Sequence, residues 1–441
     1  MLTSYHCVNN KKNSYNFNTE VITVFIVTYV YVALQVQVIR EPSPDLDFDL
    51  SRIPLAGFPS KKCRREIIPN NILILKKHYF SPQTLKYGGK CVSLHIDMEL
   101  WLKDILHNML LTASPSGSEE QITALFAEQV RPFVDEVTTD AIGNCIAHKR
   151  GSGPKVMLMA HADEIGLMIS YIDECGFLYF NQIGGIDTNM LPGLRVVIQG
   201  KQGPVIGIVC KKPIHLQSEK EAGGSLSPDD LWIDIAATDK ADALTKVQIG
   251  SVATFEPHVQ MLTDDKILSK SLDDKIGLAV LLGIAKALKD KPTSADLYFV
   301  ASVQEEIGAR GAQTVSEAIL PEIGIAVDVT MATDHPATSP AKDGDISLSK
   351  GPVIPQGPNM NKGINQSLIS IAEASHIPYQ VEAIAKPTGT DARMIQVAGQ
   401  GIKTGLVSIP CRYMHTPGEM VSLSDANHAV TLLAEYLHTF R

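Results

Sequence analysis

Residues 294–306 read SADLYFVASVQEE, an apolar run that ends in two adjacent glutamates, Glu305 and Glu306. The aromatic and β-branched residues of the run predict a buried strand. Two like charges at the end of a buried strand are costly, because each carboxylate must lose water and each repels the other. A buried arginine, solvent or a metal ion would have to offset both costs. The stretch therefore predicts a buried sheet and indicates a polar site where this strand ends.

Apolar strands alternate with helices on both sides of this stretch, which is the pattern of an α/β sheet. The clearest predicted elements are three strands, over residues 156–160, 323–330 and 404–409, and one long, largely buried helix over residues 274–289. Two further helices are predicted from Met98 onward and after the run SPSGSEE, where Ser114 to Ser118 supply capping residues and Glu119 and Glu120 occupy the first turn.

The pattern of apolar and turn-forming residues changes between Gly166 and about Pro257. Short β-like runs are broken there by glycine and proline, which is typical of a small β-barrel or sandwich. The α/β pattern resumes at SKSLDDKIG. We therefore expect a β domain at 166–257 inserted into a catalytic domain formed by residues 98–165 and 258–441.

Polar side chains gather where the predicted strands end and where the long helix begins. They are His161, Asp163, Asp273, Asp274, Glu305, Glu306, Asp328 and His415. Functional sites of α/β sheets lie at the carboxyl ends of the strands. Two histidines with several carboxylates suit zinc, cobalt or manganese better than magnesium alone.

Each of these residues also has a purely structural interpretation. His161 could be a hydrogen-bonded core histidine, the two aspartates could cap the helix, and the glutamate pair could bind Arg310. Asp328 is harder to explain in this way, because an unpaired acid inside a buried strand is expensive. Since all these interpretations would have to hold together, we expect a metal site.

The glutamate pair bears on the type of chemistry. Adjacent residues of an extended strand point to opposite sides, so one glutamate can bind a metal while the other reaches a water from a different angle. A glycosidase instead needs two carboxylates about 5–10 Å apart that converge on one bond. The pair therefore favours a metal-dependent hydrolase over a cellulase.

Six motifs in the sequence resemble those of a known family. AHADEIG, SLDDKIG, SVQEEIGARGA, VDV, GTDA and IPCRYMHTPGE look like the co-catalytic metal aminopeptidases that include glutamyl aminopeptidase and the tetrahedral (TET) peptidases. The resemblance covers about Met98 to Arg441. It implies a mixed-sheet α/β di-zinc exopeptidase domain whose inserted β-barrel-like domain mediates homo-oligomerisation, up to a tetrahedral dodecamer that admits short peptides.

The resemblance also implies two divalent metal ions per subunit, zinc first and cobalt or manganese as alternatives. Five side chains would hold them: His161, Asp273, Glu306, Asp328 and His415. Asp273 would bridge the two ions, His161 and Asp328 would complete one, and Glu306 and His415 would complete the other.

Further roles follow from the same resemblance. Glu305 would be the general base that takes a proton from the water between the metals, and Asp163 would orient the His161 ring. The segment 389–392 (GTDA) and Arg412 would line the substrate side. Lys275 stands where the family often has arginine, and lysine cannot make a forked contact.

The predicted activity is removal of amino-terminal residues from short peptides. A related di-metal deacylase or carboxypeptidase is the nearest alternative. Those enzymes usually carry their extra domain between the glutamate pair and the final histidine, whereas the insertion here falls between His161 and Asp273. Cellulase activity and a metal-bound scaffold without catalysis are weaker alternatives.

Composition limits the partners. The 441 residues carry a net charge of -9, which argues against nucleic acid or an anionic membrane surface. Seven widely spaced cysteines without a CxxC pair suggest neither a disulfide framework nor a thiolate zinc site, so we expect a reducing cytoplasm.

Residues 1–97 read unlike the rest and carry none of the six motifs. Residues 21–39, VITVFIVTYVYVALQVQVI, have no charge and are barely long enough to cross a bilayer. A membrane anchor, a disordered leader and a reading frame extended upstream of a start at Met98 are the three interpretations. We favour the extended frame, and the sequence leaves the other two open.

Overall fold

A computed structural model of the chain contains two compact units, residues 1–97 and 98–441. It describes residues 98–440 apart from 219–223, 290 and 292, and it describes only the strands of the first unit. The first five of those strands pair into one sheet and the last two into another. They are β1 (Leu2–His6), β2 (Thr23–Tyr29), β3 (Ala33–Ile39), β4 (Arg65–Ile68), β5 (Ile72–Leu75), β6 (Thr84–Tyr87) and β7 (Lys90–Ser93).

Two of these strands, β2 and β3, occupy most of the apolar stretch 21–39 and pair antiparallel with each other. Across the part of the chain that the structure describes, no helix has both the length and the apolar character needed to cross a membrane.

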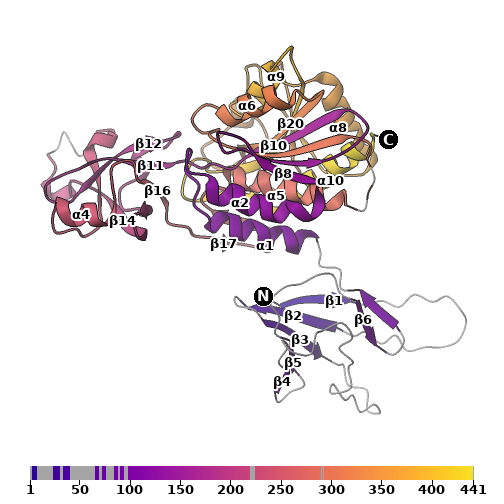
Figure 1. The fold of residues 1–441 in the computed structure, drawn as a ribbon, viewed down its shortest axis with the longest axis horizontal. Coiled ribbons are helices and arrows are strands. Elements are labelled where there is room, and N and C mark those ends of the chain that lie inside the picture. The colour runs from indigo at the N-terminus through magenta and orange to yellow at the C-terminus, as the bar shows by residue number, and fades with distance from the viewer. Residues whose placement is uncertain are drawn as a thin grey trace, which may run out of the picture. The chain divides into compact units, whose positions relative to one another are not determined.

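A mixed sheet forms the centre of the second unit (Figure 1). Its order is β17-β18-β24-β23-β20-β10-β19-β9-β8, with β21 beside β23 and β22 beside β21. The strands β23, β20, β10 and β19 are parallel neighbours. The bounds are β8 (Glu136–Thr139), β9 (Cys145–Lys149), β10 (Lys155–His161), β17 (Gln260–Met261), β18 (Lys266–Ser269), β19 (Asp296–Ser302), β20 (Ile323–Met331), β21 (Val353–Gln356), β22 (Gln380–Ala383), β23 (Lys403–Arg412) and β24 (Glu419–Ser422).

Helices cover both faces of this sheet (Figure 1). The period-two alternation of a strand assigns side chains to the two faces. In β10, Val156, Leu158 and Ala160 enter the core that contains α1, α2, α5, α8 and α10, whereas Met157 and Met159 enter the core with α6 and α9. The helices are α1 (Met98–Leu111), α2 (Glu120–Val130), α5 (Leu272–Ala287), α6 (Arg310–Ile319), α7 (Pro340–Asp343), α8 (Lys362–Ala374), α9 (Ala392–Val397) and α10 (Leu423–His438).

The segment inserted between β10 and α5 contains a closed barrel of order β11-β12-β15-β14-β13-β16. The barrel has its own buried core, which includes Leu167, Ile169, Val196 and Ile198. Its elements are β11 (Gly166–Ile172), β12 (Leu178–Ile183), β13 (Arg195–Gly200), β14 (Gly203–Lys211), β15 (Leu231–Asp234), α4 (Lys240–Lys246) and β16 (Val252–Phe255). The predicted fold class, an α/β domain with an inserted barrel, is confirmed.

Two local predictions were wrong, at the end of β19 and at the cap of α2, and the start of α5 is more irregular than an ordinary helix start. β19 ends at Ser302, so the two glutamates lie in the following turn and not on an extended strand. α5 begins at Leu272, and Asp273 and Asp274 within its first turn have non-helical backbone angles and are joined by a cis peptide bond. The residue that caps α2 is Glu119, and its side chain makes no capping hydrogen bond.

Candidate metal centre

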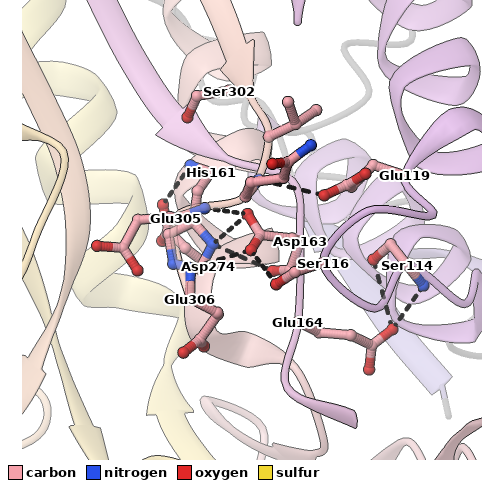
Figure 2. A network of polar contacts seen from close by, with 12 residues as sticks. Ser114, Ser116, Glu119, His161, Asp163, Glu164, Asp274, Ser302, Glu305 and Glu306 are labelled. Atoms are coloured by element: carbon pink, nitrogen blue, oxygen red, sulfur yellow. Dashed lines mark hydrogen bonds and ion pairs between the residues drawn. The ribbon is translucent and has the colours of Figure 1, made fainter. Parts of the chain in front are cut away.

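The sheet brings the predicted site residues to one edge. His161 is the last residue of β10, Glu305 and Glu306 follow β19, Asp328 lies in β20, and His415 follows β23. These four strands are parallel neighbours, so their carboxyl ends lie side by side. Asp273 and Asp274 reach the same edge from the start of α5, and Figure 2 shows part of the resulting network.

Both histidines are oriented in the same way. His161 Nδ1 lies 3.1 Å from the carbonyl oxygen of Asp163, and His415 Nδ1 lies 2.8 Å from the carbonyl oxygen of Gly185. A carbonyl only accepts, so we assign the proton of each neutral ring to Nδ1. Each Nε2 is thereby left as the atom able to bind a metal, which is how backbone carbonyls orient metal-binding histidines.

The two Nε2 atoms converge on Asp273. Its Oδ1 lies 2.9 Å from His161 Nε2, and its Oδ2 lies 3.4 Å from His415 Nε2. Hydrogen bonds from the two histidines, and their positive charge when they are protonated, hold the pKa of Asp273 below its usual range despite burial. The carboxylate of Asp273 therefore spans the two halves of the site.

Possible ligand atoms form two groups in the described residues. His161, Asp273 and Glu306 make up one, and His161, Asp274 and Asp328 make up the other, with all atoms of a group within 4.8 Å of one another. His415 joins the first group, since its Nε2 is 3.4 Å from Glu306 Oε2. Asp274, considered from the sequence as a helix cap, is fully buried and accepts the N–H of Gly277.

The negative charge of the site exceeds what its histidines offset. Burial, with Asp328 and Asp391 nearby, raises the pKa of Glu305 to about 10. Burial and Asp273 raise the pKa of Glu306 to about 8, and the same two causes raise the pKa of Asp328 to about 8. Divalent cations favour the ionised form of such carboxylates. The residues present therefore fit a metal centre.

Glu305 differs from the other acids in its contacts. Its Oε1 is buried and receives no hydrogen bond from the described residues. Arg310, the structural partner considered from the sequence, is exposed and forms no ion pair with either glutamate within the described ranges. A buried carboxylate oxygen without a donor is the form expected of a group that receives a proton from a bound reactant.

Asp163 contacts other parts of the site in addition to His161, its expected partner. Its carboxylate lies 3.5 Å from His161 Nδ1, and it accepts 2.9 and 3.0 Å hydrogen bonds from the amides of Glu305 and Glu306. The hydroxyl of Ser116 donates to it at 2.6 Å (Figure 2). Asp163 thus links the histidine to the glutamate pair.

Comparison with known proteins places this geometry in a family. A sequence profile described as M42 glutamyl aminopeptidase matches residues 143–432. A lysyl aminopeptidase from Pyrococcus furiosus is 37% identical over 343 residues, which are 77% of this chain and 97% of that protein. The chain belongs to the M42 glutamyl aminopeptidase family. The resemblance found in the motifs is confirmed, and the chain is a peptide-bond hydrolase.

Solved structures of similar proteins share the fold. An aminopeptidase from the archaeon Desulfurococcus kamchatkensis is 33% identical with a TM-score of 0.73, covering 78% of this chain and 96% of that one. The TET1 peptidase of Pyrococcus horikoshii is 31% identical with a TM-score of 0.67, covering 76% and 99%. The latter is described as assembling into a tetrahedron or a large octahedral shell.

Two residues of this M42 site were missed from the sequence. Glu419 is buried and accepts the amide of Asp273 at 3.1 Å and the amide of His415 at 2.9 Å. Its signal was its place in the HTPGE motif, four residues after His415. Ser116 was interpreted as a helix cap, and no local signal separates that role from its hydrogen bond to Asp163.

Two further residues from the sequence analysis have defined partners. They are Arg412, expected on the substrate side, and Lys275, which stands where the family often has arginine. Arg412 makes a forked ion pair with Asp334, at 2.7 Å from Nε and 2.6 Å from Nη2. Lys275 is fully buried and donates to Glu164 Oε1 at 2.9 Å and to the carbonyl oxygen of Thr112 at 2.6 Å. The lysine thus makes two separate contacts in place of one fork.

Proposed function

We propose that this protein is a metal-dependent aminopeptidase that uses two divalent ions. The observation that carries the proposal is the convergence of two correctly oriented histidine Nε2 atoms on the two oxygens of Asp273, among carboxylates whose charge only cations would offset. Asp273 would be shared by the two ions, His161 and Asp328 would complete the binding of one, and Glu306 and His415 would complete the binding of the other.

The chemistry follows from the residues around the ions. The bound cations would polarise the scissile carbonyl and lower the pKa of a water. Glu305 takes the proton of the attacking water and passes it to the leaving amine, since its Oε1 is free to accept. Asp163 orients the His161 ring and holds the amides of both glutamates.

The substrate is a short peptide with a free amino terminus. The excess of carboxylates at the site favours the ammonium group of such a peptide over an acylated terminus. Zinc is the first candidate for the native metal, before cobalt or manganese.

A homo-oligomer, up to a tetrahedral dodecamer, is proposed from the assembly described for the Pyrococcus horikoshii relative. The inserted barrel supports this proposal, because Ile206 and Ile208 of β14 and Ile214 and Leu216 beyond it are exposed. A cytoplasmic location remains a prediction from the wide cysteine spacing.

The alternatives are weaker on two grounds. In a deacylase or carboxypeptidase with a lid, the extra domain would lie after the glutamate pair, whereas the barrel here lies before α5. In a cellulase the two glutamates would face one glycosidic bond, whereas Glu306 lies beside His415 and Asp273.

The test uses the full chain, stripped by a chelator and reloaded with Zn²⁺, Co²⁺ or Mn²⁺. A panel of aminoacyl chromogenic substrates, N-acylated counterparts and a reducing-sugar assay are run side by side, with Glu305→Gln as the control. Metal-restored release of amino-terminal residues that the variant lacks supports the proposal. Cleavage of the N-acylated substrates alone, or release of reducing sugar alone, would overturn it.

A further inference from the structure

The segment that carries the glutamate pair is held by side chains rather than by a neighbouring strand. After β19 ends at Ser302, the next four backbone N–H groups donate to four oxygen atoms on three side chains from other parts of the chain. Asn144 Oδ1 accepts Val303 at 3.0 Å, Glu119 Oε1 accepts Gln304 at 3.1 Å, and the two oxygens of Asp163 accept Glu305 and Glu306 at 2.9 and 3.0 Å. We call Asn144, Glu119 and Asp163 the amide clamp.

The clamp lies where the backbone most needs support. Gln304 has φ +59°, in the left-handed region that a residue with a Cβ rarely adopts. This turn directs the chain out of the sheet, so the direction of the next residue, Glu305, depends on it. The amide of Gln304 is bonded only to Glu119 among the described residues.

The buried side chain of Glu119 serves backbone amides. It is 5% exposed, its side chain does not cap α2, and its Oε1 accepts the amide of Gly117 at 2.7 Å as well as that of Gln304. Within the described ranges it forms no ion pair with a lysine or arginine. Figure 2 shows the contact between Glu119 and the backbone of this segment. A buried carboxylate that serves two amides is well suited to hold a backbone in place.

The other clamp residues are less suited to a test. Asp163 also contacts His161, and Asn144 donates to Asp140, to the carbonyl of Gly311 and to Thr314 as well. Replacing either would disturb several contacts at once. Glu119 can be altered with less collateral change.

We propose that Glu119 is a positioning residue for catalysis, holding the amide of Gln304 so that Glu305 points at the reacting water. The inference rests on the proposed function, in which Glu305 is the general base. Displacement of a catalytic group by about 1 Å can cost on the order of 100-fold in rate.

The test compares Glu119→Gln with Glu119→Met in the metal-loaded full chain. Both side chains match glutamate in length, but only glutamine keeps an acceptor oxygen for the Gln304 amide. We expect Met to lower kcat by about 10–100-fold with KM changed less than about threefold, and Gln to stay within about threefold of wild type. Glu120→Met, at the exposed neighbour on α2, is the matched control and is expected to match wild type.

Bound metal and melting temperature are measured on each variant to separate positioning from folding. An effect on kcat with full metal content and a melting temperature near wild type supports the inference. A Met variant with wild-type kcat, or equal losses in Met and Gln, overturns it. If the wild-type enzyme itself releases no amino-terminal residue, the proposed function fails instead, and the two failures are thereby distinguished.

Discussion

The two histidines of the site have different surroundings. The His161 side chain is 2% exposed, ends a central strand and is enclosed by Asp163, Asp273 and Asp328. The His415 side chain is 36% exposed, lies in the loop after β23 with φ +61°, and has its ring held by Gly185, just beyond the barrel strand β12. One half of the site is therefore built by the sheet core, and the other depends on a loop and on the inserted barrel.

The largest effect is expected at the buried half. Glu305→Gln should lower activity by about 10²–10⁴-fold, because the variant has no base to accept the proton. In the metal-free protein the same change should raise the free energy of unfolding at pH 7. The pKa of Glu305 is about 10 in the folded protein and 4.5 in the unfolded chain, so the wild-type protein loses stability as the pH rises above 4.5. Glutamine does not titrate, so the variant does not lose stability in this way.

Both parts of this prediction are measurable on one preparation. Turnover of an aminoacyl substrate gives the first, and chemical denaturation of chelated protein at pH 4.5 and pH 7 gives the second. A Gln variant that is less stable than wild type at pH 7 would contradict the raised pKa of Glu305 in the folded, metal-free protein.

Replacing each histidine by alanine compares the two halves directly. Both variants should lose metal, but only His161→Ala should strongly destabilise the metal-free protein, by about 3 kcal/mol, because it removes a fully buried partner that Asp163 and Asp273 share. His415→Ala should cost less than about 1 kcal/mol at its partly exposed position. Urea unfolding after chelation measures both, and equal losses would contradict the distinction between the halves.

The contribution of the barrel is tested at Gly185. A Cβ there would lie 3.2 Å from His415 Nδ1, so Gly185→Ala should shift the ring and weaken metal binding at that half by about tenfold. Gly363→Ala is the matched control, since its Cβ would also meet an atom at 3.2 Å, Asn361 Oδ1, away from the site. Competition with a chromogenic chelator reports the affinity. Wild-type affinity in Gly185→Ala would show that the barrel does not orient the ring.

The smallest effect is expected at Asp265, which precedes β18. Asp265 accepts the hydroxyls of Ser349 and Ser422 and the amide of Ser424, next to β24, and these hydrogen bonds hold its pKa below its usual range despite burial. Its stabilisation is present above pH 3.8 and is lost as pH falls through the lower folded pKa. Asp265→Asn should therefore lower stability at pH 7 by less than about 1 kcal/mol, after solvent screening.

The difference from wild type should shrink when unfolding is repeated below pH 4. A gap that widens on acidification would contradict the lowered pKa of Asp265.

The residue pattern was sufficient for the sheet and for the edge at which the site lies. Alternation along 156–160 assigns Val156, Leu158 and Ala160 to one face and the two methionines to the other, which is a property of the extended backbone. Parallel strands place their carboxyl ends together, so residues such as His161 and Asp328 could be predicted as neighbours from the strand pattern alone. The inserted barrel was likewise visible in its glycine- and proline-broken β runs.

Only the tertiary structure decided which polar residues hold those site residues in place. Ser116 and Glu119 follow local rules for a helix start, yet their partners Asp163 and Gln304 lie 47 and 185 residues away. Gly185 reaches His415 across 230 residues. A hydrogen bond of this kind depends on the distance between two segments after folding, whereas a sequence pattern records only what each segment favours locally. For this reason the polar residues that gather at this edge could be predicted from the sequence, whereas the contacts that Ser116, Glu119 and Gly185 make there could not.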